Sequence, residues 1–126
     1  MRITDGLAAL RLAPEPAGSA VVSIGVFDGV HLGHQAILAA NLVRARTLDA
    51  VPTVVTFRSH PKELLLGHAP LTLTSIDHRL ELFAEAGIQH CLVLDFTAEL
   101  RSYDAEDFTR KVLLEGLGAR AFVLGF

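Results

Sequence analysis

Residues 24–34 read Ile24-Gly25-Val26-Phe27-Asp28-Gly29-Val30-His31-Leu32-Gly33-His34. An apolar strand here enters a glycine-rich turn, and the turn leads into a helix start that carries two histidines. The first turn of a helix presents backbone N–H groups without intrahelical partners and the positive end of the macrodipole, so an anion is stabilised there. The pattern therefore predicts a strand–turn–helix unit that binds the phosphates of a nucleotide.

The two histidines are the candidate phosphate ligands. His31 and His34 stand three apart, so on a first helical turn both rings project to one side, and Gly33 between them lets a ligand approach the backbone. The ordinary imidazole pKa of about 6.5 allows a bound phosphate to favour the charged form, which donates two hydrogen bonds. Two other interpretations stay open: a zinc site, for which nothing nearby in the sequence completes the ligand set, and a pair that merely caps and packs the helix.

The composition is that of one folded domain. The chain has 126 residues, of which 51% are hydrophobic and 20% charged, and its formal net charge is -3. A chain of this length buries about two thirds of its unfolded surface. The charge offers no basic surface to nucleic acid, no uninterrupted apolar run reaches the ~18 residues of a membrane span, and the start lacks the layout of a signal peptide. We expect a cytoplasmic domain that binds small anions, with neither nucleic acid nor a membrane as its partner.

Apolar runs bounded by Gly, Pro and polar residues alternate with helical periodicity, which is typical of an α/β fold with a parallel sheet. Strands are expected over about 20–26, 53–58, 90–95 and 120–125. Helices are expected over 32–48, from the N-cap Ser75 to Gly87, and from a capping pair, Asp104 and Asp107, to Gly116 and Gly118. The arm before the loop 14–19 is left without an assignment.

Apolar residues at helical spacing are expected to face the sheet. They are Ile37, Leu38, Ala40 and Val43 in the first helix, Ile76, Leu80 and Phe83 in the second, and Phe108, Val112 and Leu113 in the third. The single cysteine, Cys91, lies in an apolar run and is interpreted as strand packing rather than as a reactive thiol.

The stretch V-V-S-I-G-V-F-D-G-V-H-L-G-H-Q resembles the opening of the bacterial bifunctional riboflavin kinase/FMN adenylyltransferases, the prokaryotic FAD synthetases. H-x-G-H alone marks the wider nucleotidyltransferase (HIGH) superfamily, whereas the extended motif is more specific. Further segments agree in the same order: Val55-Thr56-Phe57, Ser59-His60-Pro61, Leu73-Thr74-Ser75, Leu94-Asp95-Phe96-Thr97, Glu106-Asp107-Phe108 and Val123-Leu124-Gly125. The resemblance covers nearly the whole chain and implies a Rossmann-like nucleotidyltransferase fold, a parallel sheet with helices on both faces.

Together with the crossover rule, the resemblance predicts that the four strands, numbered along the chain, lie in the order 3-2-1-4. Gly25 and Gly125 would then lie side by side at the switch point. In the family, the chain continues with an Asn or Asp and a Phe-rich loop, an I-S-S-T motif and a riboflavin kinase domain. We therefore expect residues 1–126 to be the N-terminal portion of an FMN adenylyltransferase domain, incomplete at its C-terminus and without the kinase domain.

The resemblance implies adenylyl transfer from ATP, accompanied by Mg²⁺, to FMN, which gives FAD and pyrophosphate. His31 and His34 are the implied catalytic residues, and no metal ligand is assigned. The implied nucleotide-binding residues are Gly25, Val26, Phe27, Asp28, Gly29, His31, Gly33, His34 and Gly125. The implied flavin-binding residues are Phe57, Ser59, His60, Pro61, Leu65 and Phe108.

Several roles stay open at the level of sequence. Asp28 is either a turn former or an acidic group that biases Mg²⁺ or a histidine, and Arg58 is either a phosphate ligand or a solvated surface charge. His68, His78 and His90 are interpreted as structural or exposed. For the whole chain, the alternatives are a related nucleotidyltransferase that acts on another phosphorylated substrate, and a truncated fragment with little or no catalytic activity. The sequence does not indicate an oligomeric state.

Overall fold

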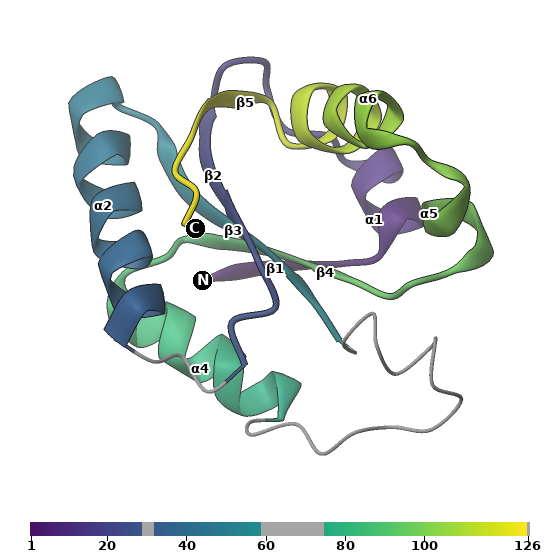
Figure 1. Cartoon of the computed structure of the whole chain (residues 1–126). Helices are drawn as coiled ribbons and strands as arrows, with labels where there is room; N and C mark the ends of the chain where they lie inside the picture. The colour runs from purple at the N-terminus through teal and green to yellow at the C-terminus, as the bar shows by residue number, and fades with distance from the viewer. Residues whose placement is uncertain (29–31, 59–74, 126) are drawn as a thin grey trace.

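The computed structural model describes residues 1–28, 32–58 and 75–125, and they form an α/β fold around one parallel sheet (Figure 1). The sheet has five strands in the order β1-β4-β3-β2-β5, and every neighbouring pair runs parallel. The strands are β1 (Arg2–Asp5), β2 (Ala20–Ile24), β3 (Val51–Phe57), β4 (His90–Leu94) and β5 (Ala119–Phe122). The predicted order of the four strands that the sequence indicated, β4-β3-β2-β5, is confirmed.

The N-terminal arm supplies the elements that the sequence left unassigned. Strand β1 extends the sheet beyond β4, and the short helix α1 (Leu7–Leu12) follows it. The bounds of the predicted strands also change. Strand β2 ends at Ile24, opposite Val55 of β3, and β3 and β4 end together at the pair Phe57 and Leu94, so the predicted extensions to 26, 58 and 95 lie beyond the strands. The predicted 120–125 becomes Ala119–Phe122.

Helices cover both faces of the sheet, as predicted (Figure 1). Helices α2 (Leu32–Leu48) and α4 (Ile76–Ala86) lie on one face. The other face carries α1, α5 (Ala98–Ser102), α6 (Ala105–Asp107) and the π-helix η1 (Phe108–Gly116). Because side chains alternate along a strand, Val54 joins the cluster under α2 and α4 while Val55 joins the cluster on the opposite face. Both valines are fully buried, as are Thr53 and Thr56, so β3 is covered on both faces as an interior strand of a parallel sheet.

The face that α2 turns toward the sheet differs from the prediction. Leu38 is buried as expected, but Ala40 is exposed and Val43 is 63% exposed. The buried positions follow Leu38 by three and seven residues, at Asn41 and Ala45. Hydropathy alone missed Asn41 because the donor half of its side-chain amide finds acceptors inside, while its Oδ1 is buried without a hydrogen-bond partner among the described residues. Its amide donates to the carbonyl of Val21 at 3.2 Å, to Ser23 Oγ at 2.9 Å and to the carbonyl of Thr53 at 3.3 Å.

The predicted helix ends are confirmed by their hydrogen bonds. The hydroxyl of Ser75 accepts from the backbone N–H of His78 at 3.1 Å, and Gly87 ends α4 in the left-handed region at φ 102°. Asp104 and Asp107 form a reciprocal capping box at the start of α6. Among the described residues, no helix combines the length and the apolar character that crossing a bilayer requires.

Candidate active site

A cavity of about 410 Å³ lies at the carboxyl ends of β2 and β5. It is lined by Ile24, Gly25, Phe27, Gly33, His34, Ile37 and Gly125. The predicted juxtaposition of Gly25 with Gly125 is therefore confirmed, and the first turn of α2 adds Gly33 and His34. A Cβ on Gly125 would collide with Cδ1 of Ile37, and one on Gly25 would stand 3.1 Å from the ring of Phe27. Glycine at these two positions therefore lets Ile37 and Phe27 pack directly against the backbone of the cavity wall.

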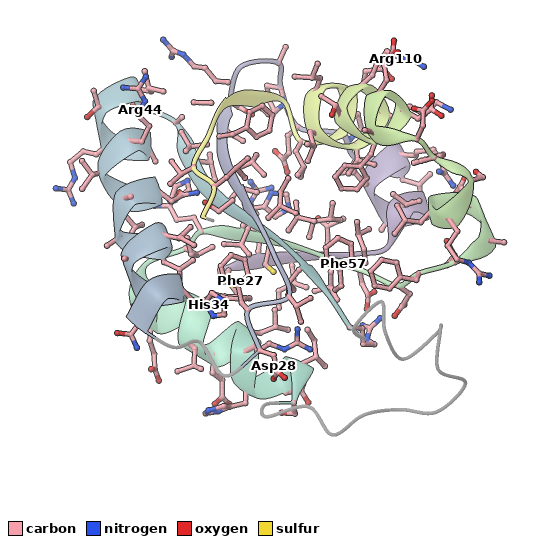
Figure 2. The ribbon with its side chains drawn as sticks, in the orientation of Figure 1. Phe27, Asp28, His34, Arg44, Phe57 and Arg110 are labelled. Atoms are coloured by element: carbon pink, nitrogen blue, oxygen red, sulfur yellow. The ribbon has the colours of Figure 1, made fainter. Side chains whose placement is uncertain are left out.

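The ring of His34 is oriented by aromatic neighbours (Figure 2). Its centroid lies 5.1 Å from that of Phe27 at an interplanar angle of 69°, and Phe27 in turn packs edge-on against Phe83 at 5.4 Å. Phe27 is 3% exposed and has φ 57°, a left-handed conformation that costs a residue with a Cβ about 1–2 kcal/mol. The buried ring contacts offset this strain. His34 Nδ1 is shielded from solvent, which makes Nε2 the candidate ring nitrogen for a ligand.

A second cavity, of about 440 Å³, lies beyond the carboxyl ends of β3 and β4 and is rich in aromatic rings. Its lining consists of Phe57, Phe96, Leu100, Arg101, Tyr103, Asp104, Ala105 and Phe108. The rings of Phe57 and Phe96 are stacked, with centroids 4.9 Å apart and an interplanar angle of 12°. Phe57 and Phe108, both predicted to contact a flavin, thus meet in one hollow. Its flat aromatic walls suit a planar ring system.

Arg79 occupies the space between the turns that follow β2 and β3. Its side chain is 1% exposed, and Nη1 donates to the carbonyls of Val26 at 2.7 Å and Phe57 at 2.9 Å. Nη1 also donates to Thr56 Oγ1 at 3.3 Å, and Nη2 donates to the carbonyl of Arg58 at 3.3 Å. A buried charge is tolerated when it is hydrogen-bonded in this way. Arg79 therefore links the carboxyl ends of two neighbouring strands.

Arg58 forms ion pairs rather than an open phosphate site. Its guanidinium contacts Asp5, the last residue of β1, and Asp95, which directly follows β4, each at 2.7 Å. The hydrogen bond that Arg58 donates to Asp5 is the largest cause that raises the pKa of Arg58, and the charge of Asp95 raises it further. The group is therefore occupied by carboxylates in this structure. Neither interpretation from the sequence, phosphate ligand or solvated charge, anticipated that it joins three strand ends.

The remaining predicted site residues divide into two groups. Gly29, His31, Ser59, His60, Pro61 and Leu65 lie outside the described residues. Val26 and Asp28 follow β2 without lining the cavity of His34, and Val26 offers its carbonyl to Arg79 and Thr56. Within the described ranges, no group of three or more His, Cys, Asp or Glu side chains is placed to hold a metal ion. A zinc site at the start of α2 would need His31 as a ligand, and His31 lies outside the described residues.

The other histidines and the cysteine have structural surroundings. His78 is exposed with Nδ1 3.8 Å from Glu81, whereas His90 is buried with Nε2 2.9 Å from Thr4 Oγ1. His68 lies outside the described residues. Burial raises the pKa of Cys91 to about 12, so its thiol stays protonated and its interpretation as strand packing is confirmed.

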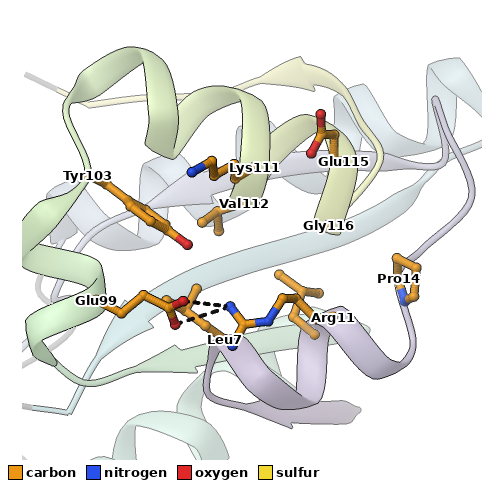
Figure 3. A pocket seen from close by; sticks show the side chains of 10 residues that line it. Leu7, Arg11, Pro14, Glu99, Tyr103, Lys111, Val112, Glu115 and Gly116 are labelled. Atoms are coloured by element: carbon orange, nitrogen blue, oxygen red, sulfur yellow. Dashed lines mark hydrogen bonds and ion pairs between the residues drawn. The ribbon is translucent and has the colours of Figure 1, made fainter.

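A third hollow, of about 500 Å³, lies between α1, α5 and η1 and contains none of the predicted site residues (Figure 3). Three of its four charged groups, Arg11, Glu99 and Lys111, have partners, and the fourth is Glu115. Arg11 donates to both carboxylate oxygens of Glu99 at 3.1 Å, and the Lys111 ammonium lies 4.9 Å from the centroid of the Tyr103 ring. The two cavities at the carboxyl edge of the sheet remain the better candidates, since ligands of open parallel sheets bind at that edge.

Comparison with known proteins assigns the family. The sequence profile described as FAD synthetase matches residues 13–126. The chain belongs to the FAD synthetase family. A bifunctional riboflavin kinase/FMN adenylyltransferase of Pseudomonas fluorescens is 36% identical over 125 residues, which are 99% of this chain and 39% of that protein. One of Escherichia coli (strain K12) is 30% identical over 126 residues, 99% of this chain and 40% of that protein.

The chain therefore spans about two fifths of the length of these relatives. A crystal structure of a macrolide-efflux protein from Streptococcus pneumoniae superposes with a TM-score of 0.83 at 23% identity. The match covers 100% of this chain and 48% of that one. At this level of identity the likeness shows the fold alone, and it agrees with the predicted Rossmann-like α/β architecture.

Within this member of the FAD synthetase family, sequence reasoning missed Phe96, Tyr103 and Arg79. Phe96 stands directly after a predicted strand, in a segment already noted for its resemblance, so its position at the carboxyl edge could have been inferred. Arg79 carried no such signal, because an arginine among the charged residues of an amphipathic helix is normally solvated. Its burial follows from the approach of two strand ends that are remote in sequence.

Proposed function

We propose that the protein catalyses adenylyl transfer from Mg-ATP to FMN, with FAD and pyrophosphate as products. The observation that carries the proposal is the convergence of Gly25, Gly33, His34 and Gly125 on one cavity, at the same edge of the sheet as an aromatic cavity. Family membership supports it, since the similar proteins of P. fluorescens and E. coli are named FMN adenylyltransferases.

The cavity of His34 would take the phosphates of ATP. It opens beside the first turn of α2, a helix of 17 residues whose N-terminal amides and dipole favour an anion. The bare glycine backbone permits a close approach, and His34 Nε2 would donate a hydrogen bond to a phosphate oxygen. His31 has the same proposed role, on the strength of its spacing from His34. Mg²⁺ belongs in this proposal to the substrate, Mg-ATP, rather than to a resident protein site.

The aromatic cavity would take the isoalloxazine ring of FMN. Phe57, Phe96 and Phe108 come from three different elements or their ends and line one hollow, as a flat apolar ligand requires. Ser59, His60, Pro61 and Leu65 follow Phe57 in the sequence and remain proposed flavin contacts on the basis of the family resemblance.

The proposed reaction needs no covalent enzyme intermediate. A phosphate oxygen of FMN attacks the α-phosphorus of ATP, a new P–O bond forms, and the bond from the α-phosphorus to the bridging oxygen breaks as pyrophosphate leaves. Holding two mutually repelling anions in line and stabilising the charge that develops on the phosphate oxygens would then account for catalysis. Histidine N–H groups at a helix N-terminus can hold the phosphates in place and can also stabilise the charge that develops on their oxygens.

In the decisive experiment, the protein encoded by its complete reading frame is incubated with Mg-ATP and FMN. We expect FAD and pyrophosphate in equal amounts. Riboflavin is the matched control, because it has the same ring without the attacking phosphate and cannot accept an adenylyl group. Appearance of FMN from riboflavin would reveal a kinase activity carried by a further domain.

Two other outcomes would contradict the proposal. Transfer to another phosphorylated alcohol, with FMN inert, would assign a related nucleotidyltransferase instead. Absence of transfer to any acceptor would favour a fragment without activity, an alternative that the two-fifths coverage of the relatives keeps relevant.

A further inference from the structure

The guanidinium of Arg79 is a charge placed almost wholly inside the protein, at 1% exposure. Removing such a group from water is costly, and hydrogen bonds to backbone carbonyls are what make it tolerable here. The carbonyls that it binds are not those of its own helix. They belong to Val26, Phe57 and Arg58, which follow or end two strands that are adjacent in the sheet.

These carbonyls stand at the edge of the sheet where both candidate cavities open. Val26 separates Gly25 from Phe27, which both line the cavity of His34, and Phe57 lines the aromatic cavity. Thr56 gives a second link between the two turns, because its hydroxyl donates to the carbonyl of Val26 at 2.8 Å and accepts from Arg79. One buried cation therefore joins the walls of two cavities.

Helix α4 holds the same turn at a second point. Phe83 lies four residues after Arg79, on the same side of the helix, and its ring packs against that of Phe27. Phe27 in turn packs against His34. Through Arg79 and Phe83, α4 thus contacts both the backbone and the aromatic ring of the turn after β2. A shift of this helix would move His34 relative to Phe57.

We propose that Arg79 is a positioning residue that sets the turn after β2 at a fixed distance from the end of β3, so that the two substrates meet in line. The inference rests on the proposed adenylyl transfer. Each cavity keeps its own lining when Arg79 is replaced, so each substrate still binds. What changes is the alignment of the attacking oxygen with the α-phosphorus, and a displacement of about 1 Å can cost about 100-fold in rate.

The test compares Arg79→Met, Arg79→Lys and Thr56→Val with the unaltered protein. Met keeps the apolar part of the side chain and removes all hydrogen bonds, whereas Lys retains a charge with three donors on one nitrogen. Arg44→Met is the matched control, since Arg44 is exposed and lies toward the other end of α2 from His34 (Figure 2). For each variant, kcat for FAD formation is measured beside the dissociation constants of ATP and FMN, each bound alone.

We expect Arg79→Met to lower kcat by about 10- to 100-fold while both dissociation constants stay within about threefold. Arg79→Lys should recover part of the rate, Thr56→Val should show a smaller loss of the same kind, and Arg44→Met should be unchanged. An unaltered kcat in Arg79→Met overturns the inference. So does a parallel loss of binding and rate in Arg79→Met and Thr56→Val, which would make the contact merely structural.

Hydrogen exchange separates this inference from the proposed function. The Gly25 amide donates to the carbonyl of Val55 at 3.0 Å, and the Arg58 amide donates to that of Leu94 at 2.9 Å. In Arg79→Met, both amides should exchange faster while the amides of central β4 keep their protection. If the unaltered protein makes no FAD but this local pattern appears, the link between the turns stands and the proposed function fails. Unchanged exchange at both amides overturns the link itself.

Discussion

Truncation of Phe96 is the sharpest test of the aromatic cavity. Its ring is stacked on Phe57 with centroids 4.9 Å apart, and both rings line the same hollow of about 440 Å³. Stacking of an aromatic side chain on a nucleobase is worth about 1–3 kcal/mol, and an isoalloxazine has a larger face. We therefore expect Phe96→Ala to weaken FMN binding by about 5- to 150-fold. Riboflavin should lose the same factor, because it presents the same ring.

Phe96→Leu separates stacking from simple apolar contact. Leucine preserves most of the apolar volume but has no π face, so its loss should be confined to the part specific to aromatic pairs, about 0.5–1.5 kcal/mol, or about 2- to 10-fold in affinity. Titration of riboflavin and FMN fluorescence against each variant measures these factors. Leu12→Ala, at an apolar side chain that is 88% exposed and lines neither cavity, is the control.

The affinity for ATP shows whether the effect of Phe96 is confined to the aromatic cavity. The cavity of His34 shares no residue with the aromatic one, so ATP binding should be unchanged in both variants. An equal loss for ATP and flavin would show that Phe96 supports the fold as a whole. Undiminished flavin affinity in a folded Phe96→Ala protein would refute the assignment of this hollow to the flavin.

Three further predictions concern the rest of the carboxyl edge and the core. Removing the imidazole donor by His34→Ala should lower kcat by about 100- to 1000-fold, as measured by steady-state FAD formation, with only a small decrease in melting temperature from the lost contact with Phe27. Burial lowers the pKa of His90 below its ordinary 6.5. As the pH falls below 6.5, the unfolded state therefore takes up a proton before the folded state does. The folded protein loses stability over this pH range. Urea unfolding from pH 8 to pH 5 should accordingly show a weaker acid dependence in His90→Gln, by at most about 1.4 kcal/mol per pH unit. Arg58→Met should cost no more than about 2 kcal/mol, because its two ion pairs are largely exposed, and most of that cost should disappear in ~1 M salt; an undiminished cost at high salt would contradict the electrostatic explanation.

The sequence predicted the lining of the cavity of His34 better than that of the aromatic cavity. Gly25, Gly33, His34 and Gly125 meet in one cavity because β2 and β5 are neighbours, an order that the family resemblance predicted together with the crossover rule. Phe57 and Phe108, each predicted to contact a flavin, both line the aromatic cavity, and their proposed role remains a prediction. Phe96 and Tyr103 complete the same hollow, but their convergence depends on how α5 and α6 fold back over β4, which periodicity does not specify.

The wrong prediction of the buried face of α2 has a related cause. Ala40 and Val43 are apolar and were assigned to the sheet, whereas Asn41 is buried instead. A hydropathy pattern scores a side chain by its own transfer free energy, but Asn41 is stabilised by acceptors on β2 and β3 that only the packed structure supplies.

By itself, the sequence determined the types of the elements from residue 20 onward except α5, the helix caps at Ser75 and Asp104, and, through its motifs, the family and with it the order of the four predicted strands. The element types and caps depend on interactions between residues close in the chain, and the family depends on motifs contained in single segments. The tertiary structure alone decided that Arg79 and Asn41 are buried and that Arg58 joins three strand ends. A polar side chain is stable inside a protein only when its partners are in place, and those partners come from strands that are brought together by folding.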